Sequence, residues 1–276
     1  MADYFSTLST TQKNNIAFII KRMKEKGITN PISQAGILAV VSKESGFIPK
    51  SEISYKNTSN DRIRSIFYKL RNYSDADLNT LKASDENFFN KIYGGMYGNS
   101  STEGYKYRGR GLNQLTFKGN YQAIAPKIGV DIVTYPDKMN ELPVATDALI
   151  QYFLDRFTAA PVDKLSAYNS TGINDFKNIT DSVNAAYHAN AGWGHSVNAV
   201  KNDGTGGHEK ALSRGDGFLT MSKELAESGG NIQLFFLRRV WANKYGKIAI
   251  ITTGIITLTG IGIFIYDRNL KSKKQK

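Results

Sequence analysis

Apolar positions recur with a helical period along most of the first two hundred residues. In residues 9–26 the apolar side chains lie three or four positions apart, which is the spacing of one buried face of an α-helix. Ser9 and Gln12 have the spacing of a capping box at the start of this segment, and Gly27 follows its last apolar residue. The sequence therefore predicts a first amphipathic helix that ends at Gly27.

A second helix is predicted to begin at Asn30-Pro31, a cap residue followed by proline at the first helical position, and to run to Gly46. Residues 47–60 show no helical period. Further helices are predicted over 61–93, 112–128, 144–157 and 174–200, the last interrupted near Gly192 and Gly194, with a Gly- and Tyr-rich loop over 93–111. Strands do not alternate with helices and no repeat is present, so we predict a mainly α-helical fold.

The composition changes beyond Lys201, where the sequence NDGTGGHEKALSRGDG is typical of a linker. The sequence predicts three regions: a folded domain over 1–203, a linker or stalk over 204–240, and a membrane anchor with a basic tail over 241–276. In this interpretation residues 204–276 serve only to tether the folded domain.

The predicted anchor contains the segment 248–266, which is 19 residues long and has no charged side chain. As a helix it would be ~28 Å long, close to the thickness of the hydrocarbon core of a bilayer. Trp241, Tyr245 and Tyr266 flank it at positions that favour the membrane interface. We expect a transmembrane helix in contact with membrane lipids; because basic residues lie on both sides, its orientation stays open.

The net charge of +12 is concentrated near the same end of the chain. Residues 231–276 hold nine Lys or Arg and one acidic residue, which gives eight of the twelve net positive charges. A nucleic-acid partner is therefore not expected for the folded domain. The chain has no cysteine, so no disulfide framework is possible. The first eleven residues lack the pattern of a secretory signal, and we expect none.

Metal chemistry has little support in the sequence. The three histidines are His188, His195 and His208, and no pair has the spacing of a common metal motif. His188 is expected to be a packed core residue. We predict no metal and no cofactor.

Two glutamates are better candidates for chemistry. Glu44 lies in the last turn of the helix that ends before Gly46, where the negative end of the helix dipole disfavours an ionised carboxylate. A general acid that works near neutral pH needs such a setting. Glu52 follows eight residues later, and a chain that turns back after the helix could place it opposite Glu44. Spacing along the sequence permits this arrangement but does not determine the distance.

A third candidate element is the run Tyr105-Lys106-Tyr107-Arg108-Gly109-Arg110-Gly111-Leu112-Asn113-Gln114-Leu115-Thr116. By itself the RGRG sequence could be a basic nucleic-acid loop, but it occurs once and lacks RGG repetition. Tyrosines beside Arg, Gln and Thr also suit a sugar-binding groove, where rings stack on aromatic side chains and hydroxyls need polar partners.

Together these segments resemble glycoside hydrolase family 19, which contains plant-type chitinases and related phage and bacterial endolysins. The resemblance rests on KESGF with Glu44, EISY with Glu52, YGGMYGNSSTEGYKYRGRGLNQLTFKGNY (93–121), GVDIVTYPDKM (129–139) and VNAAY (183–187), in this order over residues 31–200. It implies a two-lobed, lysozyme-like helical fold with small β or loop elements and a central glycan cleft.

The resemblance also implies roles for single residues. Glu44 matches the general acid, Glu52 the carboxylate that activates water, and Thr116 the hydroxyl residue that helps to hold that water. The matches to cleft-lining, substrate-binding positions are Tyr107, Gln114 and Asn184. Asn113 stands where the family is usually apolar, VNAA replaces Ile-Asn-Gly-Gly, and the cysteines of plant members are absent; these departures affect the expected substrate preference more than catalysis.

Within the family the substrate is chitin or peptidoglycan. The YRGRGLNQLT sequence resembles the endolysin-like members more closely, which favours the peptidoglycan strands of the bacterial cell wall. A lytic transglycosylase is the rival enzyme, because ESGFIPKS resembles the helix-end motif of that group. From another class, a non-catalytic wall-binding or virion structural protein is the alternative. A C-terminal anchor without a signal indicates a phage lysis or entry enzyme acting on the wall from a virion or the host inner membrane. A bacterial tail-anchored remodelling enzyme is the alternative, and the oligomeric state stays open.

Overall fold

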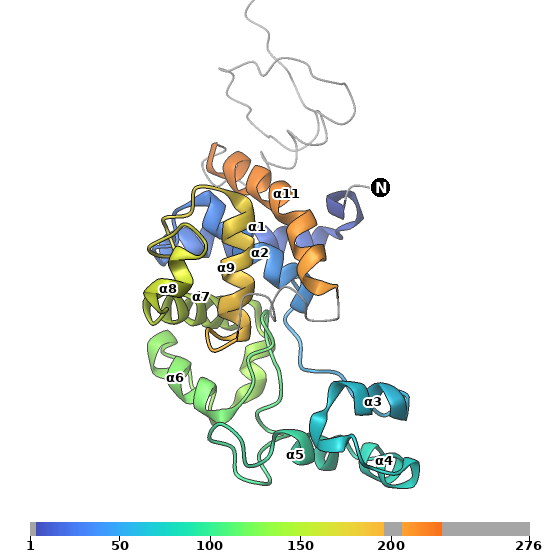
Figure 1. The fold of residues 1–276 in the computed structure, drawn as a ribbon. Helices are drawn as coiled ribbons and strands as arrows, with labels where there is room; N and C mark the ends of the chain where they lie inside the picture. Colours follow the sequence, from blue (N-terminus) through green and yellow to red (C-terminus); the bar gives the residue numbers. More distant parts are fainter. Residues whose placement is uncertain (1–3, 196–205, 228–276) are drawn as a thin grey trace, which may run out of the picture. The chain divides into compact units, whose positions relative to one another are not determined.

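The structure, a computed structural model, describes residues 4–195 and 206–227, which are mainly α-helical (Figure 1). These residues form ten α-helices, and their one β pairing is an isolated bridge between Arg110 and Leu115. The predicted mainly α class is confirmed. The α-helices are α1 (Thr10–Glu25), α2 (Pro31–Glu44), α3 (Asn60–Ile66), α4 (Asp75–Lys82), α5 (Asp85–Tyr93), α6 (Lys118–Ile128), α7 (Leu142–Thr158), α8 (Val162–Ser166), α9 (Ile179–Ala191) and α11 (Gly207–Glu227). Three 3-10 helices are η1 (Tyr4–Thr7), η2 (Tyr68–Leu70) and η3 (Pro136–Asn140).

The first two helices begin as their sequences predict. The Ser9 hydroxyl accepts the N–H of Gln12 at 3.2 Å, and the Gln12 side chain accepts the N–H of Ser9 at 2.9 Å, which completes the capping box. Asn30 caps α2 by accepting the N–H of Ile32 at 2.9 Å, and Pro31 occupies the first helical position. Local sequence therefore determines where α1 and α2 start.

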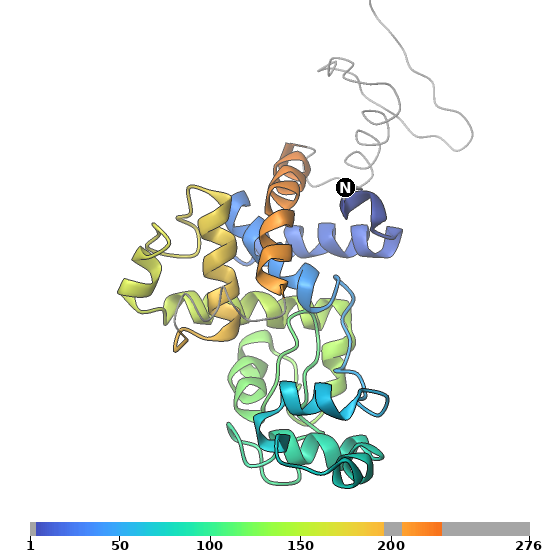
Figure 2. The same ribbon diagram turned by 45° about the vertical axis from the view of Figure 1, so that its right-hand side comes forward.

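Helix α2 is the central helix of the described fold, since it is buried around most of its circumference and packs against both α9 and α11 (Figures 1 and 2). Gly36 lets α9 approach closely, because a Cβ there would lie 2.2 Å from the Ser182 hydroxyl oxygen. Gly215 does the same where α11 meets α9, because its Cβ would lie 2.9 Å from Cγ1 of Ile179. Small residues thus set the close packing of these three helices.

Helix α11 corrects the predicted linker. Residues 207–227 form a helix that buries its apolar face, including Phe218, Met221 and Leu225, against the rest of the fold. Arg214 of this helix donates to the backbone oxygen of Ser42 at 3.2 Å and to its hydroxyl at 3.0 Å, near the C-terminal end of α2. The polar, glycine-containing sequence concealed the helix because only one stripe of it is apolar. This part of the predicted stalk belongs to the folded domain.

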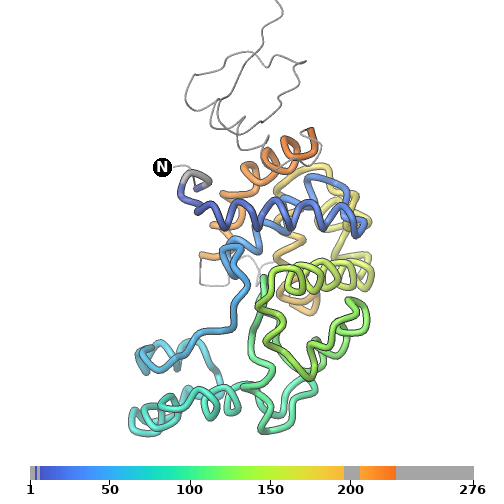
Figure 3. The backbone as a smooth tube through the Cα atoms, turned by 180° about the vertical axis from the view of Figure 1, so that it is seen from behind, coloured from blue at the N-terminus to red at the C-terminus, as the bar shows by residue number. Residues whose placement is uncertain are grey.

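Helices α1 and α7 (yellow-green) run beside each other (Figure 3). A paired ion contact joins them. The guanidinium of Arg22 donates to both carboxylate oxygens of Asp147, at 2.6 and 2.8 Å. A two-point Arg–carboxylate contact fixes orientation as well as distance. Helix α7 itself matches the predicted helix over 144–157, apart from small differences at its ends.

The segment 61–93 is helical, as predicted, and is divided into three short α-helices with 3-10 helix η2 between the first two. Each α-helix has its own serine cap: Ser59, Ser74 and Ser84 accept backbone N–H groups of α3, α4 and α5. These helices surround a separate aromatic core, whose buried members are Ile63, Leu70, Leu78, Phe88, Phe89 and Ile92, with Tyr55, Phe67, Tyr73, Leu81, Tyr93 and Tyr105 packed against it.

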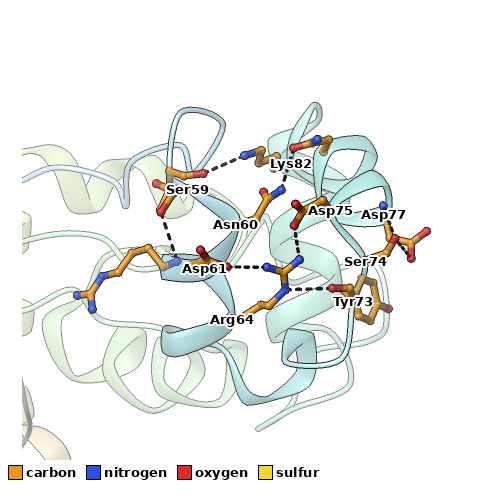
Figure 4. A network of polar contacts seen from close by, with 12 residues as sticks. Ser59, Asn60, Asp61, Arg64, Tyr73, Ser74, Asp75, Asp77 and Lys82 are labelled. Carbon is orange, nitrogen blue, oxygen red and sulfur yellow. Dashed lines mark hydrogen bonds and ion pairs between the residues drawn. The ribbon is translucent and has the colours of Figure 1, made fainter.

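Polar contacts also tie α3 to α4 (Figure 4). Arg64 donates to Asp61 at 2.9 Å, to the backbone oxygen of Tyr73 at 3.1 Å, and also to Asp75. Lys82 at the end of α4 donates to the backbone oxygen of Thr58 at 2.9 Å. These contacts hold together a group of helices that are too short to be stable alone.

The helix predicted over 112–128 begins only at Lys118. Residues 110–115 instead form a tight turn closed by two backbone hydrogen bonds between Arg110 and Leu115, at 3.1 and 2.8 Å. Gln114 and Phe117 have φ values of +54° and +75°, which an α-helix does not permit. The turn therefore replaces the first part of the predicted helix.

The predicted membrane anchor over 241–276, like residues 228–240 of the predicted stalk, lies outside the described residues. Among residues 4–195 and 206–227, no helix combines the length and apolar character that crossing a bilayer requires. The predicted span 248–266 stays a prediction.

Candidate active site

Three donors surround the carboxylate of Glu52, which is half-buried. The hydroxyls of Tyr55 and Tyr93 donate to its Oε1 at 3.2 and 3.0 Å. The backbone N–H of Gly109 donates to its Oε2 at 3.2 Å. Because both oxygens accept hydrogen bonds, the carboxylate is held in one orientation and its ionised form is favoured.

Opposing effects act on the proton affinity of Glu52. Burial raises the pKa of Glu52 above its usual range, while the hydrogen bonds from Tyr93, Gly109 and Tyr55 and the positive charge of Arg108 act to lower it. Burial also raises the pKa of both tyrosines, with a further contribution from the Glu52 charge, so the phenols keep their protons and act as donors. A carboxylate with a raised pKa is a stronger base than an exposed one.

The tight turn over 110–115 brings Gln114 to the same place as Glu52. Residues 50–52 run beside 109–111: the N–H of Glu52 donates to the oxygen of Gly109 at 2.7 Å, and the N–H of Gly111 donates to the oxygen of Lys50 at 3.0 Å. The Gln114 amide also donates to the oxygen of Lys50, at 3.0 Å. The turn is therefore joined to the segment that carries Glu52.

Gly109 occupies the space between these two side chains. A Cβ at this position would lie 3.0 Å from Oε1 of Gln114 and 3.3 Å from Oε2 of Glu52. Any larger residue at 109 would have to push one of these polar groups aside. The glycine of the YRGRG motif thus lets these two side chains lie close to the backbone without being displaced.

Thr116 follows the turn directly and is half-buried. Its hydroxyl donates to the backbone oxygen of Gln114 at 2.9 Å, which leaves the hydroxyl oxygen able to accept a hydrogen bond. Glu52 and Gln114 thus meet beside Gly109, and Thr116 is joined to this pair through the backbone of Gln114.

Glu44 is the last residue of α2, as predicted, and its side chain is 20% exposed. The ammonium of Lys43 lies 3.3 Å from its Oε1. Glu44 also interacts electrostatically with Tyr152 of α7. Neither Glu44 nor Glu52 is sealed in the interior, since both are half-buried.

The turn after Glu44 is held by side chains of α1 and α11, the first and last α-helices of the described residues. Phe47 has a φ of +68° and is fully buried, with its ring edge-on to Phe218 of α11 at a centroid distance of 5.4 Å. Gln12 and Asn15 of α1 donate to the backbone oxygens of Gly46 and Phe47 at 2.9 and 2.8 Å. Helices α1 and α11 therefore determine how the chain leaves the predicted acid.

Two predicted substrate contacts have internal roles instead. Tyr107 is 1% exposed, and its hydroxyl donates to the backbone oxygen of Val133 at 3.1 Å, so its ring has no free face for a sugar. Asn184 is buried in α9, where its Oδ1 accepts the Nε2–H of His208 at 2.6 Å. Their motif positions predicted groove-lining roles, but the Tyr107 ring packs against Tyr121 of α6 and Asn184 is covered by α11.

His188 is a buried core residue, as expected. Its Nδ1 accepts the hydroxyl of Tyr168 at 2.8 Å, and its Nε2 donates to the backbone oxygen of His195 at 2.9 Å. Burial lowers the pKa of His188, which favours the neutral ring that these two contacts need.

The two tyrosines that hold Glu52, Tyr55 and Tyr93, are not among the predicted site residues. Tyr55 lies three residues after Glu52 in the EISY segment, a spacing at which a local side-chain contact is common in a turn. Tyr93 begins the YGGMYGN run and is brought in by α5. The first could have been inferred from spacing, whereas the second depends on the tertiary arrangement.

Comparison with known proteins gives one relation over part of the chain. No family model matches the sequence. A glycosyl hydrolase family 19 domain-containing protein of Haemophilus influenzae is 34% identical over 119 residues, which cover 41% of this chain and 58% of that protein. The chain is a distant relative of this family 19 protein. The predicted resemblance is confirmed at that level, and the relation indicates a glycosidase. The match spans about three fifths of the relative's length.

Proposed function

We propose that the protein hydrolyses the β-1,4 glycosidic bonds of bacterial peptidoglycan by an inverting mechanism. Glu44 is the general acid, Glu52 the general base, and Thr116 helps to hold the attacking water. The observation that carries the proposal is the Glu52 carboxylate, oriented by three donors beside the RGRGLNQLT turn. The distant family 19 relation supports the reaction class.

In this mechanism the water lies between the two carboxylates, on the face of the sugar opposite the leaving group. Glu52 accepts a proton from the water as the water oxygen bonds to the anomeric carbon. Glu44 donates its proton to the glycosidic oxygen as the carbon–oxygen bond breaks. An inverting pair needs a separation of ~6.5–9.5 Å to admit the water. Proton exchange with solvent then restores both groups.

The neighbours of the two carboxylates have distinct parts in this cycle. Tyr55, Tyr93 and Gly109 stabilise ionised Glu52 before the reaction. Lys43 stabilises Glu44 after it has given up its proton. The Thr116 hydroxyl donates its proton to the backbone oxygen of Gln114. The hydroxyl oxygen can therefore accept a hydrogen bond from the water.

The choice of peptidoglycan over chitin rests on the endolysin-like YRGRGLNQLT sequence. The biological setting we propose is a phage lysis or entry enzyme, held at a membrane by the uncharged segment 248–266. Its basic flanks favour anionic lipid surfaces. Detergent dependence of the full-length chain, compared with a chain that ends at Glu227, tests this tether; equal solubility of both without detergent would contradict it.

Product analysis on purified peptidoglycan in ¹⁸O-labelled water tests the reaction itself. A hydrolase yields reducing sugar ends that carry one ¹⁸O from the water. A lytic transglycosylase, the rival enzyme, needs one catalytic glutamate and yields anhydro-muropeptides without ¹⁸O. Anhydro-muropeptides as the main product would contradict hydrolysis. Absence of any cleavage by the wild type in a zymogram would instead favour a non-catalytic wall-binding protein.

A further inference from the structure

Tyr97 is a large aromatic residue in an unusual position. Its side chain is 71% exposed, and its backbone has a φ of +44°, in the left-handed region that non-glycine residues rarely adopt. Its ring lies against Phe117 at a centroid distance of 4.8 Å, and Phe117 itself has a φ of +75°. Strain of this kind persists only where the surroundings enforce it and is concentrated at ligand sites.

Hydrogen bonds around residues 97–99 hold the Tyr97 backbone in this conformation. The backbone oxygen of Tyr97 accepts the N–H of Gly119 at 3.0 Å, and a Cβ on Gly119 would lie 2.9 Å from that backbone oxygen. The Asn99 side chain donates to the backbone oxygen of Tyr93 and accepts the backbone N–H of Lys118, each at 2.9 Å. The loop is therefore fixed to the start of α6, and the exposed ring is held in place without being covered.

The same rings lead from Tyr97 to the proposed base. Phe117 contacts the ring of Tyr93 edge-on at 5.4 Å, and the Tyr93 hydroxyl donates to Glu52 at 3.0 Å. Tyr97, Phe117 and Tyr93 thus form a continuous aromatic row with Glu52 at its inner end. A single exposed tyrosine is ordinary on a protein surface; one held in a strained conformation at the end of such a row is not.

We propose that the ring of Tyr97 is a stacking platform for a pyranose ring of the glycan strand, next to the sugars that flank the cleaved bond. The face of an aminosugar ring presents C–H groups that pack on an aromatic face, while its edge presents hydroxyls to water. A rigid platform binds such a ring at low entropic cost. This assignment rests on the proposed function, since it takes its substrate class from the site of Glu52.

The test measures binding of soluble peptidoglycan glycan strands, freed of peptides by amidase, to the full chain in a Glu44→Gln background that prevents turnover. We expect Tyr97→Ala to weaken binding about tenfold and Tyr97→Phe to bind like the parent, because the ring is what contacts the sugar. Tyr68, which is 79% exposed and belongs to η2, provides the matched control: Tyr68→Ala should leave binding unchanged.

Tyr97→Gly separates binding from folding. Glycine adopts a positive φ without strain, so this variant should melt no lower than the parent and still lose binding. In the active background, Tyr97→Ala should raise KM about tenfold with kcat little changed. Equal affinity of Tyr97→Ala and Tyr68→Ala would overturn the platform, even if the wild type cleaves the strands. Binding that depends on Tyr97 without any cleavage would uphold the platform and refute the hydrolase.

Discussion

The hydroxyl of Tyr93 donates to the carboxylate of Glu52 at 3.0 Å, joining the last residue of α5 to a segment 41 residues earlier. Tyr93→Phe removes this donor but keeps the ring. Because the donor lowers the pKa of Glu52, its loss raises that pKa further, and the base is ionised only at higher pH. We expect the acidic limb of the kcat/KM profile to move to higher pH, so that activity falls on the acidic side of the profile and is kept on its alkaline side. An unchanged limb would contradict a base role for Glu52.

Gly109→Ala tests the space shared by Glu52 and Gln114. The added Cβ would lie 3.0 Å from the Gln114 oxygen, so one of the two groups must move. Displacement of catalytic groups by about 1 Å can cost about 100-fold in rate; the shift needed here is a few tenths of an ångström, and we expect a loss of about tenfold in kcat. Gly172→Ala is the matched control, since its Cβ would meet no atom within 4 Å. Equal activities of the two variants would refute the role of Gly109.

Glu52 also affects the pH dependence of stability. Burial raises the pKa of Glu52 above its usual 4.5, so the folded protein binds the proton more tightly than the unfolded chain does. Its contribution to stability is full below the unfolded pKa and is lost as the pH rises through the folded pKa. We expect Glu52→Gln to melt a few degrees above the wild type at pH 7 and to lose this advantage toward about pH 4. The exposed Glu86→Gln is the control, and a pH-independent difference would contradict the prediction.

Removal of α11 should unfold the domain rather than leave a folded domain without its tether. A chain that ends at Asp203 loses Phe218, which packs on Phe47 in the turn after Glu44. Phe218→Ala alone should cost about 3–5 kcal/mol of unfolding free energy. Denaturant unfolding measures both effects, and the chain ending at Glu227 is the control that keeps α11. A stable, active chain ending at Asp203 would show that α11 is dispensable.

Simultaneous replacement of Glu44 and Glu52 distinguishes catalysis from binding. Glu44→Gln and Glu52→Gln should each reduce turnover of purified cell walls by about 100-fold or more, because each removes one of the two proton transfers of the displacement. The double variant should be scarcely worse than the poorer single variant, since both act in one step. A transglycosylase would keep most of its activity in Glu52→Gln, and this result would refute the two-carboxylate mechanism.

The sequence was most informative where structure is local. Caps at Ser9 and Asn30 determine the starts of α1 and α2, and the helical period of 144–157 gave α7 almost to its ends. It failed where tertiary packing overrides local preference: Phe117 takes a positive φ inside a segment with a helical pattern, because its ring packs between Tyr93 and Tyr97.

Helix α11 was missed for a related reason. Gly215 weakens its helical signal, yet glycine is required there because Ile179 of α9 lies too close for any side chain. For the candidate site, the sequence placed Glu44 correctly at the end of α2, whereas Gln114 and Thr116, which it placed in a helix, lie in and after a tight turn. Motif positions could not show that Tyr107 and Asn184 are covered, since burial depends on elements distant in the sequence.

The contact between Phe218 and Phe47 has a consequence for how the protein is made. A ribosome delivers the chain from its N-terminus, so α2 and Glu44 emerge long before α11 does. Until residue 227 has been synthesised, the turn beyond the proposed acid lacks the ring that seats it. A wall-cutting activity would thus stay unassembled through most of its own translation.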